Sequence, residues 1–185
     1  MMNKQVPLAE RLRPKTLDDF IGQEHLVGKE EVLRKLIERK QIPSIIFWGP
    51  PGVGKTTLAQ IISHELTMPF FTLSAVSSGV KDVREVIELA RKAGKAVLFI
   101  DEIHRFNKAQ QDSLLGAVEK GIITLIGATT ENPSFEVISP LLSRSQVYVL
   151  EALGKKELLE MLSRAMKEDE FLKNKMEAIL RFSGF

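Results

Sequence analysis

Residues 49–57 form a glycine-rich segment of the kind that binds phosphate. They read Gly49, Pro50, Pro51, Gly52, Val53, Gly54, Lys55, Thr56 and Thr57, between the apolar run 44–48 and a stretch of helical periodicity. At such a turn the glycines let backbone N–H groups point inward, and the N-terminus of the new helix adds a positive dipole. In this pattern the lysine reaches the β- and γ-phosphates, and the first threonine ligates Mg²⁺. We therefore expect a polyphosphate site in which Lys55 contacts phosphate and Thr56 holds the metal.

An acidic pair follows a second apolar run. Residues 96–100 are continuously apolar, as in a strand buried on both faces, and Asp101 and Glu102 come next. Asp101 is expected to hold Mg²⁺ through its water shell, and Glu102 to orient or deprotonate an attacking water. The alternative is an acidic helix N-cap. Together with the glycine-rich segment, the pair favours a site that binds Mg-ATP and hydrolyses it.

Two threonines end a later apolar run. Thr129 and Thr130 follow residues 122–128, where a hydroxyl can bond the γ-phosphate or the attacking water. The alternative is a threonine turn before Asn132 and Pro133. We favour the sensing role because the carboxyl ends of parallel strands share one edge of a sheet, where ligands bind. The three motifs are therefore expected to converge.

Arg144 precedes the apolar run 147–150 and is expected at the opposite, amino-terminal edge of the sheet. That position lies away from the phosphate loop of its own chain. If Arg144 is catalytic, it serves the ATP of a neighbouring subunit as an arginine finger, an effect worth about 10³ to 10⁵ in rate in well-studied nucleotide hydrolases. The alternative is a solvated arginine after a short helix.

The order of elements predicts an α/β fold. Five apolar runs alternate with stretches of helical periodicity, which indicates a mostly parallel five-stranded sheet with helices on both faces. The runs are 44–48, 70–73, 96–100, 122–126 and 147–150, and the helical stretches include 56–66, 80–93 and 107–120. After Glu151 the pattern is helical only, which indicates the start of a small helical domain. We expect its apolar stripe to pack in a core, although such a stripe could also bind a partner helix. The stripe consists of Leu158, Leu159, Leu162, Ala165, Met166, Phe171, Met176, Ile179 and Leu180.

Composition narrows the function classes. The 185 residues are 44% apolar and 27% charged, as in a globular protein. No apolar run approaches the ~18 residues of a membrane helix, and residues 1–14 are charged without a signal-peptide core, so we expect a cytoplasmic protein without a membrane partner. Cysteine is absent and the three histidines lack ligand spacing, so no metal beyond Mg²⁺ is expected. The net charge of +2 gives no sign of DNA binding.

Two groups of polar residues allow more than one interpretation. His104 and Arg105 either couple the acidic pair to a partner or solvate the loop. A second group follows the strands of the predicted site, and its members either touch a phosphate backbone or form solvated helix faces. These are Lys81, Arg84, Lys108, Gln110 and Gln111.

The motifs resemble those of the AAA+ ATPase superfamily, in its clamp-loader and Holliday-junction-helicase branch. Residues 11–14, Asp18 and residues 20–23 resemble the adenine-side segment of that branch, in which backbone near Ile21 and Gly22 contacts the base. Ser143-Arg144 resembles its Ser-Arg-Cys finger motif, with Ser145 in place of cysteine. Residues 74–81, 104–112 and 127–136 are similar to the replication-associated recombination protein A family, whose eukaryotic relative is the Werner-helicase-interacting ATPase.

The resemblance implies an organisation and an activity. It implies an adenine-side segment at residues 1–24, a nucleotide-binding AAA+ core at 25–151 and part of a helical lid at 152–185. It also implies a DNA-dependent ATPase that acts at stalled replication forks or recombination intermediates. Such a protein binds single-strand/double-strand junctions and single-stranded-DNA-binding protein, and its full-length form is a homo-oligomer. Family members continue through a Gly-Asp-x-Arg lid motif, whereas this chain ends Ser183-Gly184-Phe185, so a truncated lid is expected.

Two other function classes remain open. One is a nucleotide-gated switch that binds DNA or protein, or a clamp-loader-like subunit with little remodelling activity of its own. The other is a small-molecule P-loop kinase. The acidic pair, the sensor-like threonines and the trailing helical region fit a kinase badly.

Overall fold

The computed structural model describes residues 7–169 and 172–174. The chain groups into two compact units. The larger unit is Gln23–Ala152, and the smaller combines Met1–Gly22 with Leu153–Phe185.

Within the described residues, the larger unit contains one sheet of five parallel strands in the order β2-β3-β4-β1-β5. The strands are β1 (Ser44–Trp48), β2 (Phe70–Ser74), β3 (Ala96–Asp101), β4 (Ile123–Thr129) and β5 (Ser145–Val149). All of β4 is buried, and β3 is buried up to Ile100. Continuous apolar runs of this kind are typical of strands covered on both faces. The predicted five-stranded parallel sheet is confirmed.

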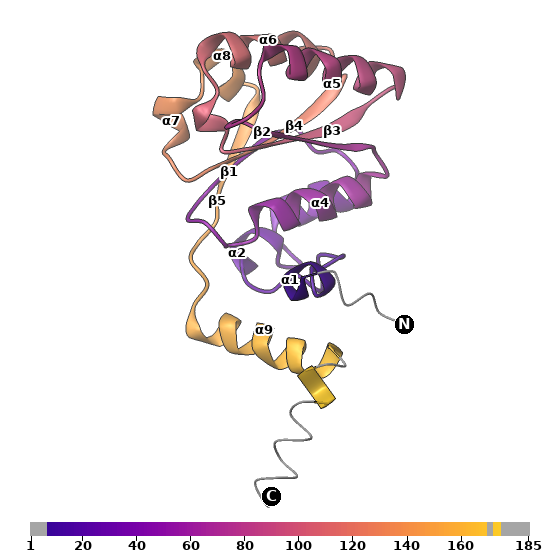
Figure 1. Ribbon diagram of the computed structural model, residues 1–185, viewed down its shortest axis with the longest axis vertical. Coiled ribbons are helices and arrows are strands. Elements are labelled where there is room, and N and C mark those ends of the chain that lie inside the picture. Colours follow the sequence, from indigo (N-terminus) through magenta and orange to yellow (C-terminus); the bar gives the residue numbers. More distant parts are fainter. Residues whose placement is uncertain (1–6, 170–171, 175–185) are drawn as a thin grey trace, which may run out of the picture. The chain divides into compact units, whose positions relative to one another are not determined.

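Helices cover both faces of this sheet. The helices of the larger unit are α2 (Glu24–Val27), α3 (Val32–Glu38), α4 (Lys55–Leu66), α5 (Val80–Lys92), η1 (Ile103–Arg105), α6 (Lys108–Glu119), α7 (Pro133–Glu136) and α8 (Ser139–Leu142). Figure 1 shows α4 on one face and α5 and α6 on the other. The core between α5, α6 and the sheet includes Val83, Leu98, Leu114 and Leu125, none of which is exposed to solvent. Each such side chain contributes about 1.5–3 kcal/mol by its burial.

The first turn of α6 is fixed by a capping box. The Asn107 side chain accepts from the Gln110 N–H at 3.0 Å, and the Gln110 side chain accepts from the Asn107 N–H at 2.8 Å. This pairing satisfies two backbone donors that a helix start otherwise leaves without partners. Gln110 also donates to the Ser78 carbonyl, just before α5, at 2.7 Å.

Gln111 contradicts both interpretations that the sequence left open, a contact with a phosphate backbone and a solvated helix face. Its side chain is 2% exposed, so it cannot touch a DNA backbone. It donates to the carbonyls of Phe106 and Glu136 at 3.0 and 2.9 Å and accepts from the Ile138 N–H at 2.9 Å. These bonds hold the α7–α8 segment to α6, because a buried amide requires partners for its polar atoms.

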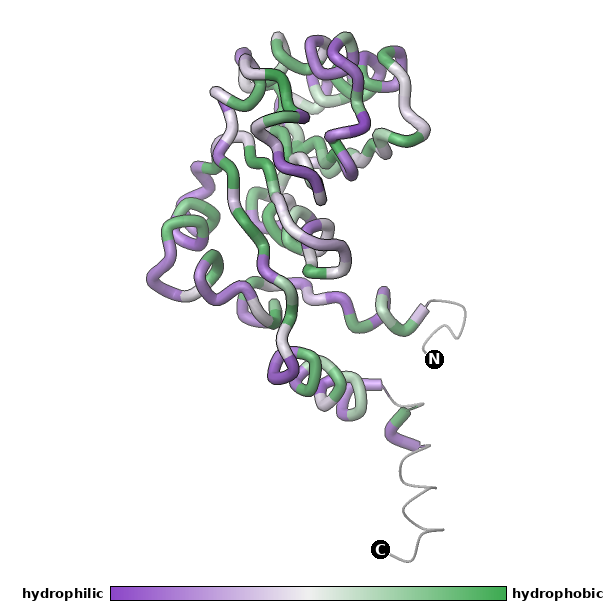
Figure 2. Tube along the Cα trace, turned by 90° about the vertical axis from the view of Figure 1, so that its left-hand side faces the viewer, coloured by the Kyte–Doolittle hydropathy of each residue, from purple (hydrophilic) through white to green (hydrophobic). Residues whose placement is uncertain are grey.

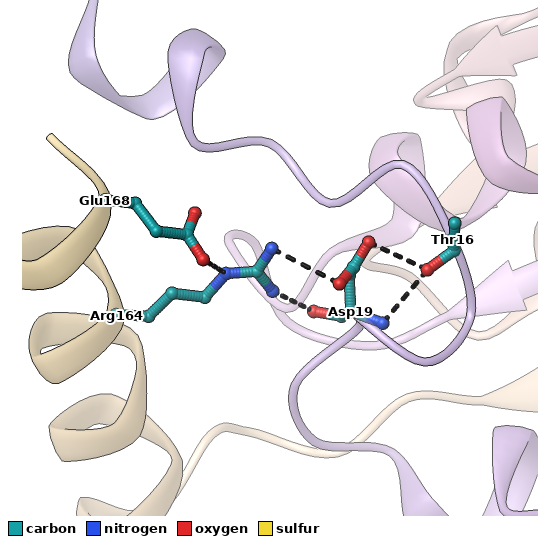
Figure 3. A network of polar contacts seen from close by, with 4 residues as sticks. All are labelled: Thr16, Asp19, Arg164 and Glu168. Carbon is teal, nitrogen blue, oxygen red and sulfur yellow. Dashed lines mark hydrogen bonds and ion pairs between the residues drawn. The ribbon is translucent and has the colours of Figure 1, made fainter.

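The smaller unit joins two segments that are distant in sequence. Its described part includes the helices α1 (Leu8–Arg11) and α9 (Lys155–Glu168). Arg164 in α9 donates to the Asp19 carbonyl at 2.7 Å, and the same guanidinium pairs with the carboxylates of Asp19 and Glu168 (Figure 3). Thr16 donates to Asp19 at 2.8 Å. Arg11 pairs with Asp169, which is 2% exposed, at 2.7 Å.

The apolar residues of α9 do not form the expected core in the described part of the chain. Leu158, Leu159, Met161 and Leu162 are all about half exposed, and α9 has no buried residue. In Figure 2 the α9 tube shows green, hydrophobic stretches beside purple ones. The core-packing prediction is wrong for Leu158, Leu159 and Leu162, while Ala165 and Met166 are half-buried. The other predicted residues, Phe171, Met176, Ile179 and Leu180, lie outside the described residues. Among residues 7–169 and 172–174, no helix is long and apolar enough to cross a membrane.

Candidate nucleotide site

The glycine-rich loop leads from the end of β1 into α4. Gly49 donates from its N–H to the Thr129 carbonyl at 3.1 Å and lies so close to the Leu150 carbonyl that a Cβ there would collide with it. Gly52 and Gly54 have φ values of 79° and 99°, which favour glycine. Nothing lies within 4 Å of the position a Gly52 Cβ would take, whereas Val53 is 4% exposed and anchors the loop. The loop is therefore held at both ends and open beside Gly52.

Lys55 begins α4 and lies within electrostatic reach of the acidic pair. Its ammonium donates to the Gly49 carbonyl at 2.6 Å and to the Pro50 carbonyl at 2.8 Å. Burial lowers the pKa of Lys55, and the negative charges of Asp101 and Glu102 act in the opposite direction. The fold thus brings these three charges within electrostatic reach of one another. Thr56 and Thr57 follow in the first turn of α4 and are half-buried.

Asp101 is the last residue of β3, and Glu102 turns the chain into η1. Asp101 is exposed and its carboxylate accepts from the Glu102 N–H at 3.1 Å. Glu102 has φ 53° and ψ 46°, a left-handed conformation that is uncommon for a residue other than glycine. Its carboxylate pairs with the Arg105 Nε at 2.6 Å. Arg105 therefore contacts the acidic pair within the chain, and coupling of this pair to a partner stays a prediction.

The residues present fit a magnesium ion. A threonine hydroxyl and a carboxylate are hard oxygen ligands, and protein-bound Mg²⁺ usually takes one or two such groups together with substrate phosphates and waters. Among the described residues, no group of three His, Cys, Asp or Glu side chains is arranged to hold a metal by itself. A site shared between Thr56, Asp101 and the phosphates is consistent with both observations.

Thr129 and Thr130 lie at the carboxyl end of β4, between β3 and β1. Thr129 is 1% exposed, and its hydroxyl donates to the Glu131 carbonyl at 3.0 Å and accepts from the Glu131 N–H at 2.9 Å. The His104 Nδ1 lies 3.0 Å from the same oxygen. Thr129 therefore closes the threonine turn that the sequence offered as the alternative. Thr130, half-buried, follows it at the sheet edge.

The three motifs accordingly follow adjacent strands. The acidic pair follows β3, the threonines follow β4 and the glycine-rich loop follows β1, and the sheet order places these strands side by side. Parallel strands share their carboxyl edge, which is where open α/β sheets bind ligands. The convergence expected from sequence is present in the fold, while the catalytic and binding roles of the individual residues remain predictions.

Arg144 lies at the amino edge of the sheet, where the parallel strands begin. It directly precedes β5, whose first residue Ser145 is opposite Ser44, the first residue of β1. Its guanidinium pairs with Glu119 at 2.6 Å and donates to the Pro140 carbonyl at 2.7 Å. Arg144, Glu119 and Lys95 line a cavity of about 460 Å³ at this edge. Glu119 was missed at the sequence level, because nothing in the pattern around residue 119 links it to residue 144.

Ile21 and Gly22 belong to the smaller unit. Both are half-buried, and Gly22 has φ 81°. A Cβ at Gly22 would lie 2.7 Å from Leu153 Cδ2, so glycine also permits a close approach to the chain before α9. Their contact with an adenine base remains a prediction.

The candidate DNA contacts are only partly accessible. Lys81, Arg84 and Lys108 are exposed on α5 and α6. Lys81 lies 3.9 Å from Glu85, at the limit of an ion pair. Gln111 is buried and is excluded, whereas Gln110 is half-buried with its side chain bonded to Asn107 and Ser78. Contact of the three cations or of Gln110 with a phosphate backbone stays a prediction.

Comparison with known proteins identifies the family. The family described as the Holliday junction DNA helicase RuvB P-loop domain matches residues 12–136. Replication-associated recombination protein A of Coxiella burnetii is 53% identical over 170 residues, covering 91% of this chain and 39% of that protein. ATPase WRNIP1 of Dictyostelium discoideum is 53% identical over 165 residues, covering 87% of this chain and 19% of that protein.

Solved structures agree with these relatives. The Thermotoga maritima RuvB Holliday junction branch migration motor has a TM-score of 0.70 and 40% identity, covering 84% of this chain and 54% of that one. The chain spans less than two fifths of the length of the curated relatives named above. The chain belongs to the AAA+ P-loop domains of the RuvB type, in the branch of the replication-associated recombination protein A family and WRNIP1.

Proposed function

We propose that this chain binds Mg-ATP at the carboxyl edge of its sheet and hydrolyses it. The observation that carries the proposal is the arrangement of three motifs on adjacent strands, with Lys55 within electrostatic reach of Asp101 and Glu102. The glycine-rich loop and the N-terminus of α4 hold the phosphates, and Lys55 contacts the β- and γ-phosphates. Gly49, Pro50, Pro51, Gly52, Val53, Gly54 and Thr57 complete the loop, and Ile21 and Gly22 contact the adenine.

Hydrolysis needs a metal and a positioned water. Mg²⁺ held by Thr56 and Asp101 neutralises phosphate charge when bound. Glu102 orients or deprotonates the attacking water, and Thr130, with Thr129 fixed beside it, reports the γ-phosphate. Arg144 acts on the ATP of a neighbouring subunit, which is supported by its place at the edge opposite its own phosphate loop.

We further propose that the hydrolysis serves DNA. The relatives are named replication-associated recombination proteins, and the structural neighbour is named a Holliday junction branch migration motor. The substrate class is therefore DNA at stalled replication forks or recombination intermediates, with single-strand/double-strand junctions as the bound form. A homo-oligomer is a proposed partner, because a finger acting in trans requires a second subunit. Single-stranded-DNA-binding protein is proposed as a partner from the family resemblance alone.

The test is ATP hydrolysis at increasing protein concentration, with and without a primer-template junction. A rate per subunit that rises with concentration and with DNA supports shared sites and a DNA substrate. A rate independent of concentration contradicts the trans role of Arg144. A rate that the junction leaves unchanged contradicts the DNA role.

One observation favours the alternative of a nucleotide-gated switch. The Glu102 carboxylate is already paired with Arg105 at 2.6 Å, so one of its oxygens is engaged within the chain instead of facing a water. In a switch, ATP binding alone clamps DNA or protein, and slow hydrolysis resets it. If Glu102→Gln stops ATP turnover but leaves DNA remodelling intact, the switch is the correct function and the motor is not.

A further inference from the structure

The ion pair between Arg144 and Glu119 joins two separate elements. Arg144 lies between α8 and β5, and Glu119 is the last residue of α6. Other exposed pairs, such as Arg91 with Glu88 and Lys81 with Glu85, lie within single helices. Exposed ion pairs contribute little stability, so the significance of a pair between elements lies in the geometry that it imposes.

The Arg144 guanidinium is oriented by contacts with its own chain. Nη2 pairs with Glu119 at 2.6 Å, and Nη1 donates to the Pro140 carbonyl at 2.7 Å and to the Ser143 hydroxyl at 3.3 Å. The arginine side chain is nevertheless 40% exposed. A guanidinium has five N–H donors, so these contacts fix its plane and leave donors for another ligand.

The element that supplies Glu119 is itself firmly anchored. α6 has 12 residues and is therefore about 18 Å long. Its first turn is fixed by the Asn107–Gln110 capping box and by the buried Gln111, which binds backbone on both sides of Val137. Further along, the buried Leu114 and Ala117 hold it against the core. A carboxylate at the end of such a helix is a rigid support for a long, flexible side chain.

We propose that Glu119 is a positioning residue for Arg144. It holds the guanidinium at the amino edge of the sheet, in an orientation that lets it contact the phosphate of ATP bound to a second copy of this chain. This inference rests on the proposed trans role of Arg144. Arginine loses considerable rotamer freedom when it is ordered, so a contact that orders it in advance raises the rate of the step it assists.

The sharpest test mixes two inactive forms of the chain. Lys55→Ala subunits keep Arg144 but lack a working phosphate site, and Arg144→Ala subunits keep the phosphate site but lack the finger. Mixing them restores hydrolysis if Arg144 acts in trans. Adding Glu119→Gln to the Lys55→Ala subunits is expected to lower the restored kcat about tenfold without changing KM for ATP. Adding it to the Arg144→Ala subunits is expected to change nothing.

Two further variants test whether Glu119 acts by orienting Arg144 or by stabilising the fold. Glu119→Asp keeps the charge on a shorter arm and is expected to recover part of the rate. Glu88→Gln removes one carboxylate from an exposed pair of similar length and is the matched control, expected to leave kcat and the unfolding temperature unchanged. By NMR of the arginine side chains, rotation of the Arg144 guanidinium is expected to be faster in Glu119→Gln than in the parent chain.

The outcomes distinguish the two proposals. If mixing restores hydrolysis but Glu119→Gln has no effect, or raises the rate, the inference about Glu119 is wrong while the trans role stands. If mixing restores nothing, the trans role itself is wrong. If guanidinium rotation is unchanged in Glu119→Gln, Glu119 does not order Arg144, whatever the kinetics show.

Discussion

At the carboxyl edge of the sheet, each functional group ends its strand, directly follows it, or lies in the loop and first turn of α4 that come after β1. At the amino edge, Arg144 depends on Glu119 from another helix and on the Pro140 carbonyl for its orientation. The first edge is shaped mainly by backbone, through the positive φ values of Gly52, Gly54 and Glu102. The second is shaped by side chains that rotate. The proposed phosphate site is thus shaped by backbone, whereas the orientation of the proposed finger depends on contacts between side chains.

The largest expected effect is at the carboxyl edge. Glu102→Gln removes the proposed base and should lower kcat about 10²- to 10⁴-fold while ATP still binds. Single-turnover hydrolysis and ATP binding, measured on the same preparation, separate the two effects. Glu136→Gln, which also removes an exposed carboxylate, serves as the control. A Glu102→Gln chain that keeps its rate would remove this residue from the mechanism.

At the amino edge, Arg144→Ala should lower kcat about 10³-fold and leave ATP affinity unchanged, because the residue lies away from its own phosphate loop. Affinity is measured by titration with a fluorescent ATP analogue. A loss of affinity in the isolated chain would show that Arg144 acts within its own subunit and would abolish the distinction between the edges.

Substitution of two glycines by alanine tests whether close backbone approach shapes the carboxyl edge. Gly49→Ala places a Cβ against the Leu150 carbonyl and should destabilise the fold by about 1–3 kcal/mol. Gly116→Ala, in α6, meets nothing within 4 Å and should stabilise it by about 0.5–1 kcal/mol. Urea unfolding measures both. Equal effects of the two substitutions would contradict the close approach at Gly49.

The smallest effect concerns Tyr148 on β5, which donates to the Gln146 side chain at 2.6 Å. Burial raises the pKa of Tyr148 above its ordinary value of 10.0. The folded chain therefore holds this proton more tightly than the unfolded chain. Its contribution to stability is complete below pH 10.0 and is lost as pH rises through the folded pKa. Since the chain has one tyrosine, ultraviolet titration reports this group alone, and Tyr148→Phe should lose the pH dependence. A measured pKa of Tyr148 at or below 10.0 would contradict the expected effect of burial.

The sequence predicted features that depend on local pattern. β1 spans the residues expected, and the chemical groups at the carboxyl edge were found because each follows an apolar run. Because Arg144 precedes the last apolar run, the sequence also predicted that it lies at the amino edge, and the structure has it directly before β5. These inferences succeed because alternation of strands and helices determines which ends of the strands meet.

Contacts between distant side chains were not predictable in this way. Gln111 and Gln110 are neighbours of the same residue type, yet one is buried as a backbone clamp and the other caps α6. Glu119 has an ordinary helix-end sequence, and only packing of α6 against α8 brings it to Arg144. The apolar face of α9 was assigned to a core because periodicity identifies a face without showing what covers it.

The bond from Arg164 to the Asp19 carbonyl spans 145 positions, and this has a consequence for biosynthesis. On the ribosome the contacts of the sheet, all within Gln23–Ala152, become available before α9 has been made. At about 5–20 residues per second, roughly 7 to 30 s separate the synthesis of Asp19 from that of Arg164. We expect the N-terminal segment to gain protection from proteases last, although it is translated first.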